Sequence, residues 1–460
     1  MLVPQDYPDR EVAVIGLGYV GLTLAAVMAE AGFRVYGVER SETILRCLTR
    51  GTAHFRERGL NRVLRHQLAR GGLSVQSGFP ISGRPTVYIV TVGTPVTDDK
   101  RTNLDSIVAV ARELVHVIRP NDLVILRSTV RVGVSRQVVK PILDEAKVPY
   151  DLAFCPERTL EGRALTELRT LPQIVGGLDD SACLRAGQIF NLITQSIVKV
   201  RDLETAEMVK LVNNVQRDLM FAFSNEVAIA CDHVGVPVSE VIQAGNVGYP
   251  RAAMPKPGPV GGPCLEKDPY IFAESVTLRG GRADLALLGR RYNETLVDRV
   301  ADFIVSYPNM LVEARVPPRI GILGLAFKGR PETSDLRGSL ALRLVASLQS
   351  KLPNAKLVGY DPAIIENEAL GIGIEIASSA EEAFEGASVV VLQNNNESFQ
   401  DLDLEKLSQR MQMDGFIYDL WDQIDARDLQ LSKGVQYCSL GNKALLPQRK
   451  RSPTTFTNAF

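Results

Sequence analysis

A glycine-rich turn near the start of the chain constrains the fold more than any other sequence feature. It reads GLGYVG at residues 16–21 and follows an apolar stretch, EVAVI, at 11–15. Gly16 permits a tight turn, Gly18 lets the backbone approach a pyrophosphate, and Gly21 lets a helix pack closely on the strand. The pattern predicts a strand–turn–helix unit that binds a dinucleotide at a helix N-terminus, where free N–H groups favour anions.

An acidic residue ends the next predicted strand, at residues 33–39. Glu39 is placed to accept hydrogen bonds from both hydroxyls of a cofactor ribose, which favours NAD. Arg40 follows it directly, and a cation there could accept the 2′-phosphate of NADP instead. The sequence therefore predicts NAD and leaves NADP open.

Composition limits the class of protein. The chain has 460 residues, a net charge of −1 and 45% hydrophobic residues, so we expect two or three globular domains and no affinity for nucleic acid. It has no run of 18 apolar residues and no apolar core of a signal peptide at its start, so we expect a cytoplasmic protein that does not enter a membrane. Six cysteines without a CxxC pair argue against disulfides or zinc, and we expect no metal.

Strands and helices alternate along the first 200 residues. Apolar strands are expected at 85–92, 122–128, 151–154 and 173–175, with a helix at 104–118. This alternation predicts a parallel, doubly wound sheet.

The pattern of strand–helix alternation ends at residue 201. Residues 203–235 and 268–306 have helical patterns and flank a Pro/Gly-rich loop at 245–263, and strand–helix alternation restarts at 319–323. The predicted fold class is α/β, with two Rossmann-like doubly wound parallel-sheet domains joined by a central helical block. The predicted divisions are an N-terminal domain 1–201, a helical domain 202–310, a C-terminal domain 311–446 and a polar tail 447–460.

A cysteine follows the Pro/Gly-rich loop. The prolines and glycines around Cys264 do not suit a core helix, so this thiol is expected to be positioned on a loop rather than packed, and Lys267 could favour its thiolate. A dinucleotide site combined with such a thiol suggests oxidation through a covalent thioester.

Polar residues follow two of the predicted strands. Glu157, in the segment CPER after the strand at 151–154, is a candidate general base, and Thr129 could position a water. Cys155 in the same segment is a rival nucleophile.

A polar face lies on the first long helix. Lys210 and Asn214 are four residues apart and therefore share a face, where they could stabilise a developing oxyanion. Arg217 adds a second cation one turn later.

These motifs together resemble the UDP-glucose/GDP-mannose dehydrogenase family from Val12 to about Leu440. The segments that carry the resemblance are GLGYVG (16–21), VGTP (92–95), STV (128–130), PERTLEG (156–162), AEMVKLVNN (206–214), GGPCLEKD (261–268), GLAFKGRPETSDLRGS (324–339) and YDP (360–362).

The resemblance implies an NAD-dependent, four-electron oxidation of a nucleotide sugar from C6 alcohol to carboxylate. It implies that Cys264 attacks the C6 aldehyde, that Lys210 and Asn214 hold the C6 oxygen, and that Glu157 is the base for thioester hydrolysis. Thr129 and Asp268 would position the water. The cofactor residues implied are Gly16, Gly18, Tyr19, Val20, Gly21, Glu39, Arg40, Thr94, Thr129 and Arg337. The substrate residues implied are Leu160, Glu161, Lys210, Asn214, Arg217, Arg251, Gly261, Phe327 and Lys328.

Within the family, the block around Arg217 and the segment Asp268-Pro269-Tyr270 resemble the branch that oxidises UDP-N-acetylhexosamines. We therefore expect a UDP-N-acetylmannosamine or UDP-N-acetylglucosamine 6-dehydrogenase, with UDP-glucose or GDP-mannose as the alternative. Pro263 stands where this branch commonly has His, Glu266 replaces a small or apolar residue, and the loop is one residue short. The resemblance also implies a homodimer or larger homo-oligomer, and a role in making surface polysaccharide.

Two other functions compete with this interpretation. A two-electron hydroxyacid-type dehydrogenase joins a Rossmann domain to helices but needs neither the cysteine loop nor a third α/β domain. A non-catalytic nucleotide-sugar-binding homologue would keep the fold, although Cys264, Lys210 and Glu157 are all retained here.

Overall fold

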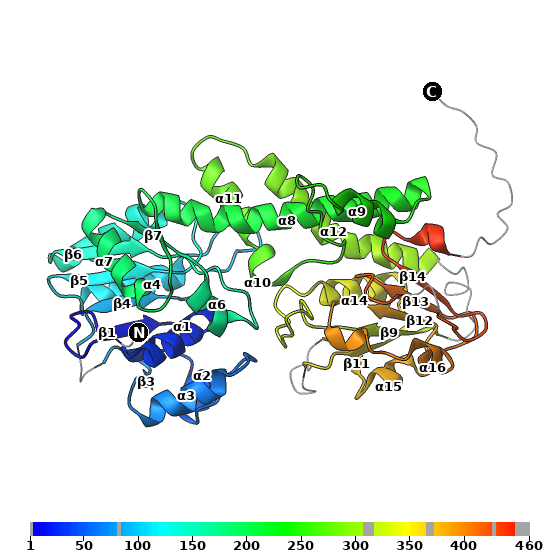
Figure 1. The fold of residues 1–460 in the computed structure, drawn as a ribbon, viewed down its shortest axis with the longest axis horizontal. Coiled ribbons are helices and arrows are strands. Elements are labelled where there is room, and N and C mark those ends of the chain that lie inside the picture. The colour runs from blue at the N-terminus through cyan, green and yellow to red at the C-terminus, as the bar shows by residue number, and fades with distance from the viewer. Residues whose placement is uncertain (1–2, 81–83, 307–316, 365–371, 426–428, 447–460) are drawn as a thin grey trace. The chain divides into compact units, whose positions relative to one another are not determined.

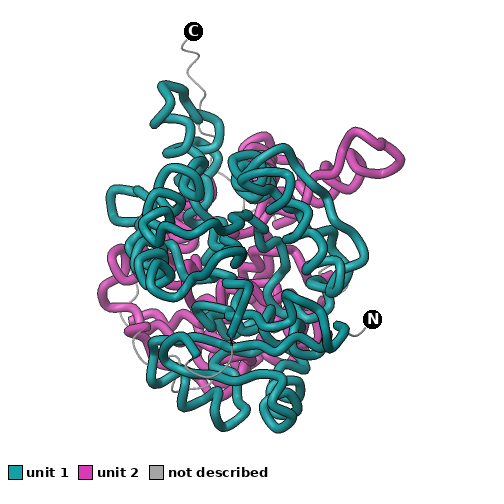
Figure 2. Tube along the Cα trace, turned by 90° about the vertical axis from the view of Figure 1, so that its left-hand side faces the viewer, with its two compact units in different colours: residues 1–218, 263–290, 333–335 teal, residues 219–262, 291–332, 336–460 magenta. Residues whose placement is uncertain are grey.

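The computed structural model describes residues 3–80, 84–306, 317–364, 372–425 and 429–446. The chain forms two compact units, shown in Figure 2. Unit 1 comprises residues 1–218, 263–290 and 333–335, and unit 2 comprises residues 219–262, 291–332 and 336–460. The predicted division into three domains stays a prediction; its boundary at 310/311 and the tail 447–460 lie outside the described residues.

Unit 1 contains an eight-stranded sheet in the order β3-β2-β1-β4-β5-β6-β7-β8 (Figure 1). Its first six strands follow the order 3-2-1-4-5-6 of dinucleotide-binding folds. The strands are β1 (Glu11–Ile15), β2 (Arg34–Val38), β3 (Leu73–Gln76), β4 (Val87–Val90), β5 (Asp122–Leu126), β6 (Tyr150–Phe154), β7 (Gln173–Gly177) and β8 (Ile197–Lys199).

One strand pair corrects the expectation of a wholly parallel sheet. β6 and β7 run antiparallel, with Phe154 opposite Gly176. The side chain of Gln173, the first residue of β7, donates a 3.0 Å hydrogen bond to the carbonyl of Pro156, just beyond β6. The chain therefore enters β7 at the same end of the sheet at which it leaves β6. The intervening helix α6 (Ala164–Thr170) does not carry the chain back to the opposite end, as a crossover between parallel strands would.

Helices cover both faces of this sheet because side chains alternate along each strand. In β1, Val12 and Val14 join the core under one set of helices, whereas Ala13 and Ile15 join the core under another. The first set is α1 (Tyr19–Ala31), α2 (Glu42–Thr49), α3 (Leu60–Ala69), α6 and α7 (Asp180–Asn191). The second is α4 (Asp105–Val115), the π-helix η1 (Ser135–Val139), α5 (Lys140–Leu143) and the start of α8. A 3-10 turn, η2 (Asp144–Ala146), follows α5.

The helical region confirms one expected element and revises two others. α8 (Leu203–Val234) matches the predicted helix closely. The stretch 268–306 forms two helices, α11 (Asp268–Thr277) and α12 (Asp284–Ser306), because Gly280 adopts a positive φ of 79° between them. Cys264 lies in a four-residue helix, α10 (Gly262–Leu265), rather than on a loop.

Unit 2 contains a six-stranded sheet, in which each described pairing is parallel. Its order, β11-β10-β9-β12-β13-β14, repeats the order of the first six strands of the sheet in unit 1. The strands are β9 (Arg319–Leu323), β10 (Lys356–Tyr360), β11 (Glu375–Ile376), β12 (Val389–Leu392), β13 (Phe416–Asp419) and β14 (Gln436–Ser439).

Helices also cover both faces of the second sheet. One face packs against α14 (Leu340–Lys351) and the part of α12 in this unit, and the other against α15 (Ala380–Phe384) and α16 (Leu404–Ser408). The remaining elements are α9 (Val238–Asn246), η4 (Glu397–Phe399) and η5 (Lys443–Leu445). The predicted fold class, two doubly wound sheet domains with a helical region, is confirmed by both sheets.

The turn after β9 resembles the turn after β1. Gly324 has a φ of 95°, and the carboxylate of Asp361, just beyond β10, accepts hydrogen bonds from the N–H groups of Leu325 (2.8 Å) and Ala326 (2.9 Å). The next helix, α14, begins only at Leu340. This turn therefore leads into a loop rather than directly into a helix.

Candidate active site

The turn between β1 and α1 has the geometry of a pyrophosphate cradle. Gly16 has a φ of 89°, which favours glycine. A Cβ on Gly21 would lie 1.9 Å from the carbonyl oxygen of Gly16, whereas nothing lies within 4 Å of a Cβ position on Gly18. Gly18 is the N-cap of α1 and no side chain caps that end. The open space before an uncapped helix N-terminus fits the phosphates of a dinucleotide.

The carboxylate of Glu39, just after β2, is hydrogen-bonded to this turn. The Glu39 carboxylate accepts hydrogen bonds from the N–H groups of Leu17 and Ser41, both at 2.9 Å. Arg40 forms an ion pair with Glu113 on α4. Glu39 is thus fixed at the position expected for a ribose-binding acid, and Arg40 is engaged by a carboxylate.

A tyrosine links the cofactor turn to a second loop. The hydroxyl of Tyr19 donates a hydrogen bond to the buried Glu57 carboxylate. The N–H of Gly162 contacts both groups at 2.8 Å. Gly162 follows the predicted substrate residues Leu160 and Glu161, so the first residue of α1 is tied to the loop that carries them. Val20, the next residue of α1, is partly buried.

The loops after β4 and β5 also meet. The Thr94 hydroxyl donates to the carbonyl of Thr129 at 2.5 Å. Thr129 is partly exposed. The structure therefore brings these two predicted residues together at the carboxyl edge of the sheet, where such folds bind ligands.

Cys264 is exposed to solvent. Although the residue is exposed, the protein atoms around its thiol partly exclude water from it, and this desolvation is the largest influence and raises the pKa of the thiol. The charges of Lys210 and Lys267 lower that pKa, whereas Asp268 and Glu161 raise it. The expected effect of Lys267 is thus present but outweighed. The thiol is reachable, and two cations lie near enough to stabilise its thiolate.

Three of the predicted residues gather around the start of α11. Asp268 is fully buried, and its Oδ2 accepts a 2.5 Å hydrogen bond from the Asn214 amide on α8. Lys267 lies 3.3 Å from Oδ1 of the same carboxylate, which accepts no hydrogen bond. Lys210, one turn before Asn214, is buried. The buried Asp268 and the half-buried Asn214 therefore form a hydrogen-bonded pair, and the buried Lys210 lies one turn earlier on α8.

Glu157 is buried and held from both sides. Its Oε1 accepts the N–H groups of Arg158 and Thr159, both at 2.7 Å. Its Oε2 accepts two bonds, at 2.6 and 3.1 Å, from the buried guanidinium of Arg127. Burial acts to raise the pKa of Glu157, but Arg127, the backbone donors and Lys210 outweigh it and hold the pKa below its ordinary value. Glu157 is therefore ionised.

The other cysteine in this region is unsuited to react. Cys155 is fully buried, and burial raises the pKa of its thiol far above the ordinary value. Both properties argue against the alternative that Cys155 is the nucleophile, because a reactive cysteine needs access and thiolate character.

Two buried arginines were missed by sequence reasoning. Arg127 follows β5 directly, and Arg290 lies on α12 with 1% of its surface exposed. The Arg290 guanidinium donates at 2.9 Å to both the Asp218 carboxylate and the carbonyl of Leu265, the residue after Cys264. An arginine in an apolar segment is a weak signal, since its partner lies far away in sequence. Arg217, a predicted substrate residue, is exposed on α8.

The remaining predicted residues belong to unit 2. A Cβ on Gly261 would lie 2.2 Å from the carbonyl oxygen of Gly338, so this loop passes close to the segment after β9. The ammonium of Lys328 lies 5.3 Å from the ring centre of Phe327. Arg337, in the same segment, is exposed. Arg251 stacks on Tyr249, 4.6 Å from the ring centre.

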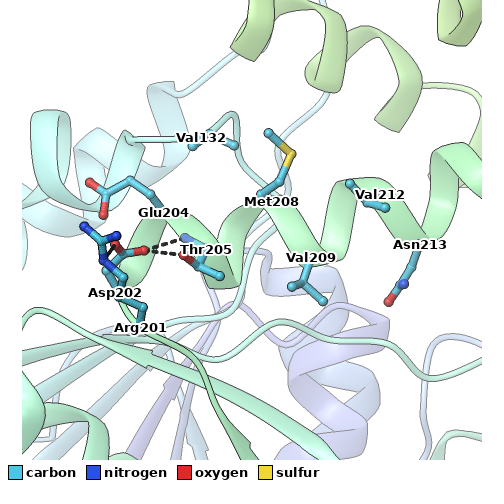
Figure 3. A pocket seen from close by; sticks show the side chains of 9 residues that line it. All are labelled: Val132, Arg201, Asp202, Glu204, Thr205, Met208, Val209, Val212 and Asn213. Atoms are coloured by element: carbon cyan, nitrogen blue, oxygen red, sulfur yellow. Dashed lines mark hydrogen bonds and ion pairs between the residues drawn. The ribbon is translucent and has the colours of Figure 1, made fainter.

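A groove lies beside the stretch of α8 that also carries Lys210. It has a volume of about 500 Å³, and its lining combines apolar side chains such as Met208, Val209 and Val212 with polar ones at Arg201, Asp202, Glu204, Thr205 and Asn213. Figure 3 shows Thr205 at one end, where Asp202 accepts its N–H and hydroxyl. The groove contains none of the predicted site residues, so its size alone does not make it the active site.

The described part of the chain has neither a helix suited to crossing a membrane nor a cluster of three or more metal-binding side chains. These findings concern only the described ranges.

Comparison with known proteins identifies the family. Three family models match: the NAD binding domain at residues 10–194, the central domain at 204–295 and the UDP binding domain at 321–426, all of the UDP-glucose/GDP-mannose dehydrogenase family. An NDP-N-acetyl-D-galactosaminuronic acid dehydrogenase from Ralstonia nicotianae is 31% identical over 89% of this chain and 96% of its own length. A UDP-N-acetyl-D-mannosamine dehydrogenase from Campylobacter jejuni is 33% identical over 76% of this chain and 86% of its own.

A solved structure shows the same architecture. The UDP-D-ManNAc dehydrogenase from Pyrococcus horikoshii has a TM-score of 0.84 and 28% identity, covering 95% of this chain and all of that one. The chain belongs to the UDP-glucose/GDP-mannose dehydrogenase family and is an NAD-dependent nucleotide-sugar dehydrogenase.

Proposed function

We propose that this enzyme oxidises the C6 alcohol of a nucleotide sugar to a carboxylate in two steps, through a thioester on Cys264. The observation that carries the proposal is an exposed thiol near the buried Lys210, beside an Asn214–Asp268 pair. NAD supplies a hydride acceptor for each oxidation when bound, so one alcohol, two NAD⁺ and one water give one carboxylate, two NADH and three protons.

The side chains have distinct tasks in this proposal. The first oxidation leaves a C6 aldehyde, and the Cys264 thiolate adds to its carbon while the oxygen takes up a proton, which gives a thiohemiacetal. Loss of a second hydride and a proton converts this to the thioester. Lys210 and Asn214 hold the C6 oxygen as negative charge develops there.

Water then cleaves the carbon–sulfur bond, which releases the acid and restores the thiol. Glu157 serves as the base in this step, and Thr129 and Asp268 position the water. Covalent attachment keeps the half-oxidised sugar on the enzyme between the two hydride transfers.

The binding residues are proposed from the same resemblance. The turn at 16–21, with Glu39, Arg40, Thr94, Thr129 and Arg337, holds NAD. The substrate residues are Leu160, Glu161, Lys210, Asn214, Arg217, Arg251, Gly261, Phe327 and Lys328. Of these, the turn at 16–21 has the strongest geometric support, because the uncapped start of α1 faces open space.

We propose a UDP-N-acetylhexosamine as substrate, with UDP-N-acetylmannosamine first and UDP-N-acetylglucosamine second. The names of the relatives support this class, since they act on N-acetylated hexose derivatives. UDP-glucose and GDP-mannose are the alternatives. A panel of these four nucleotide sugars, assayed with NAD and with NADP, tests the choice. Higher kcat/KM for UDP-glucose than for either N-acetylated sugar would reject it.

We also propose a cytoplasmic homodimer or larger homo-oligomer that supplies uronic acids for surface polysaccharide. The long helices of the central region support self-association. Sedimentation of the active enzyme tests this, and a fully active monomer at high dilution would contradict it.

The chemistry is tested by counting NADH. Two molecules of NADH per sugar are expected, and one would reject the four-electron reaction. Cys264→Ser should abolish formation of the acid, whereas Cys47→Ser, at a partly buried cysteine on α2, serves as the matched control. Binding of NAD and a UDP-sugar without an absorbance change at 340 nm would favour the non-catalytic alternative.

A further inference from the structure

Arg127 lies at the point where β5 ends and joins three segments of unit 1. Its guanidinium, 2% exposed, donates to the Glu157 carboxylate, to the carbonyl of Cys155 at 2.9 Å and to the side-chain oxygen of Gln173 at 2.8 Å. Its guanidinium carbon also lies 5.1 Å from the ring centre of Phe190 on α7. One side chain thereby connects the end of β5, the loop after β6 and the start of β7.

The contacts fix the state of Glu157 as well as its position. A carboxylate has about four acceptor positions on two oxygens. Two are occupied by Arg127 and two by the N–H groups of Arg158 and Thr159. All four contacts come from donors, so they favour the ionised form. Glu157 can act as the base only when one of these donors gives up its position to the attacking water. The charged groups that influence Glu157 are Arg127 from β5, Arg158 from its own loop and Lys210 from α8.

The arrangement requires an arginine in particular. The guanidinium is planar and presents its donors in a fixed fork, so it can bind a carboxylate, a carbonyl and an amide oxygen at once. A lysine would supply the positive charge but not hydrogen-bond donors fixed toward all three acceptors. Charge and orientation at this position can therefore be separated by substitution.

We propose that Arg127 is a positioning residue for thioester hydrolysis, which holds Glu157 as an oriented anion and fixes the loop at 155–162 that carries it. This inference rests on the proposed function, because it assigns Arg127 a role in the last step of that reaction. Arg127 acts through Glu157 and contacts neither the sulfur nor the sugar in the proposed chemistry.

The role predicts a change in pH dependence and not only in rate. Without Arg127, Glu157 stays buried but loses its nearest cation, so protonation is favoured at a higher pH than in the wild type. The rate of hydrolysis should then rise with pH across the neutral range. A purely structural role would lower the rate by the same factor at every pH.

The experiment compares Arg127→Met and Arg127→Lys in the full-length enzyme, with UDP-N-acetylmannosamine and NAD in a single turnover from pH 5 to 9. NADH formation reports the hydride transfers, and mass spectrometry of quenched samples reports the acyl adduct on Cys264. Arg185→Lys is the matched control, since Arg185 pairs with Asp9 and Asp151 elsewhere in unit 1.

In Arg127→Met we expect the adduct to accumulate, with hydrolysis slower than in the wild type at pH 6 and recovering as the pH rises. In Arg127→Lys the hydrolysis rate should keep the pH dependence of the wild type, because the positive charge is retained. The rate itself should stay below that of the wild type, because the lysine does not orient Glu157 in the same way. If the methionine variant does not fold, the lysine variant alone carries the test through its lowered hydrolysis rate and unchanged hydride transfers.

Hydrolysis with an unaltered rate and pH profile in both variants would overturn the role of Arg127 and leave the proposed function intact. In Arg127→Met, a hydrolysis rate lowered equally at all pH values would overturn it too. Absence of any adduct in the wild type, in Glu157→Gln and in both variants would instead reject the thioester reaction, and this inference with it.

Discussion

The buried carboxyl of Glu207 on α8 makes the stability of unit 1 depend on pH. It is 1% exposed and accepts hydrogen bonds from the N–H groups of Gly133 and Ser135 and from the Ser135 hydroxyl. Burial raises its pKa from 4.5 to about 7, although these donors oppose the rise. Glu207 joins α8 to the loop that follows Thr129, so its protonation bears on a segment close to the candidate site.

The direction in which the stability of unit 1 changes with pH follows from the raised pKa of Glu207. The unfolded chain releases this proton near pH 4.5, whereas the folded chain retains it to about pH 7. The stabilisation is therefore fully present below pH 4.5, falls as the pH rises, and is lost above about pH 7. At about 1.4 kcal/mol per pKa unit, the change amounts to about 3 kcal/mol across this window. For a domain of about 150–250 residues, that equals roughly 6–12 °C in Tm.

The assay is scanning calorimetry of the wild type and Glu207→Gln at pH 5, 6, 7 and 8. The glutamine does not titrate, so the transition of unit 1 should lose less stability with rising pH in the variant than in the wild type. Glu204→Gln is the comparison variant, because Glu204 lies one turn earlier and its charge adds to the raised pKa of Glu207. It should flatten the pH dependence less than Glu207→Gln does. Equal pH slopes in the wild type and Glu207→Gln, or a steeper slope in the variant, would refute the reasoning.

Three further predictions concern the site. Arg290→Met should destabilise unit 1 by about 3–5 kcal/mol, because it leaves the Asp218 carboxylate buried without its ion-pair partner; denaturant unfolding measures this, and a loss below about 1 kcal/mol would contradict it. Gly21→Ala should abolish NAD binding, measured by calorimetric titration, since its Cβ would collide with the backbone of the cofactor turn; wild-type affinity would show that the turn adapts. The rate at which iodoacetamide alkylates Cys264 should rise with a pH midpoint above that of an ordinary cysteine, and Lys210→Met should move that midpoint higher; an unchanged or lower midpoint in the variant would disprove the influence of this lysine.

The sequence predicted those features that depend on local pattern. Apolar periodicity placed most of the strands, and the GLGYVG turn with Glu39 placed the cofactor cradle, because its glycines are required by contacts within a single strand–turn–helix unit. The fold class, the NAD cofactor and the family are confirmed. The roles of the individual site residues and the domain boundaries stay predictions.

Features that depend on distant contacts escaped prediction. Arg127 meets Glu157 thirty residues later, and Arg290 meets Asp218 across 72 residues. No periodicity links such partners, and an arginine among apolar residues has no local signature. The antiparallel β7 was missed for a related reason: the direction of a strand depends on the edge at which the chain returns, which composition does not encode.

The similar turns after β1 and β9 lead into different kinds of segment. In unit 1, α1 begins at Tyr19, three positions after Gly16, whereas in unit 2 α14 begins only at Leu340, long after Gly324. The first turn can therefore bind an anion through main-chain N–H groups, which every residue type except proline possesses. The second turn leads into a loop of side chains, with Phe327 and Lys328 among them. We therefore expect pyrophosphate binding at the first turn to tolerate most side-chain exchanges, whereas we expect ligand selectivity at the UDP binding domain to depend on a few side chains that can be exchanged without rebuilding the sheet beneath them.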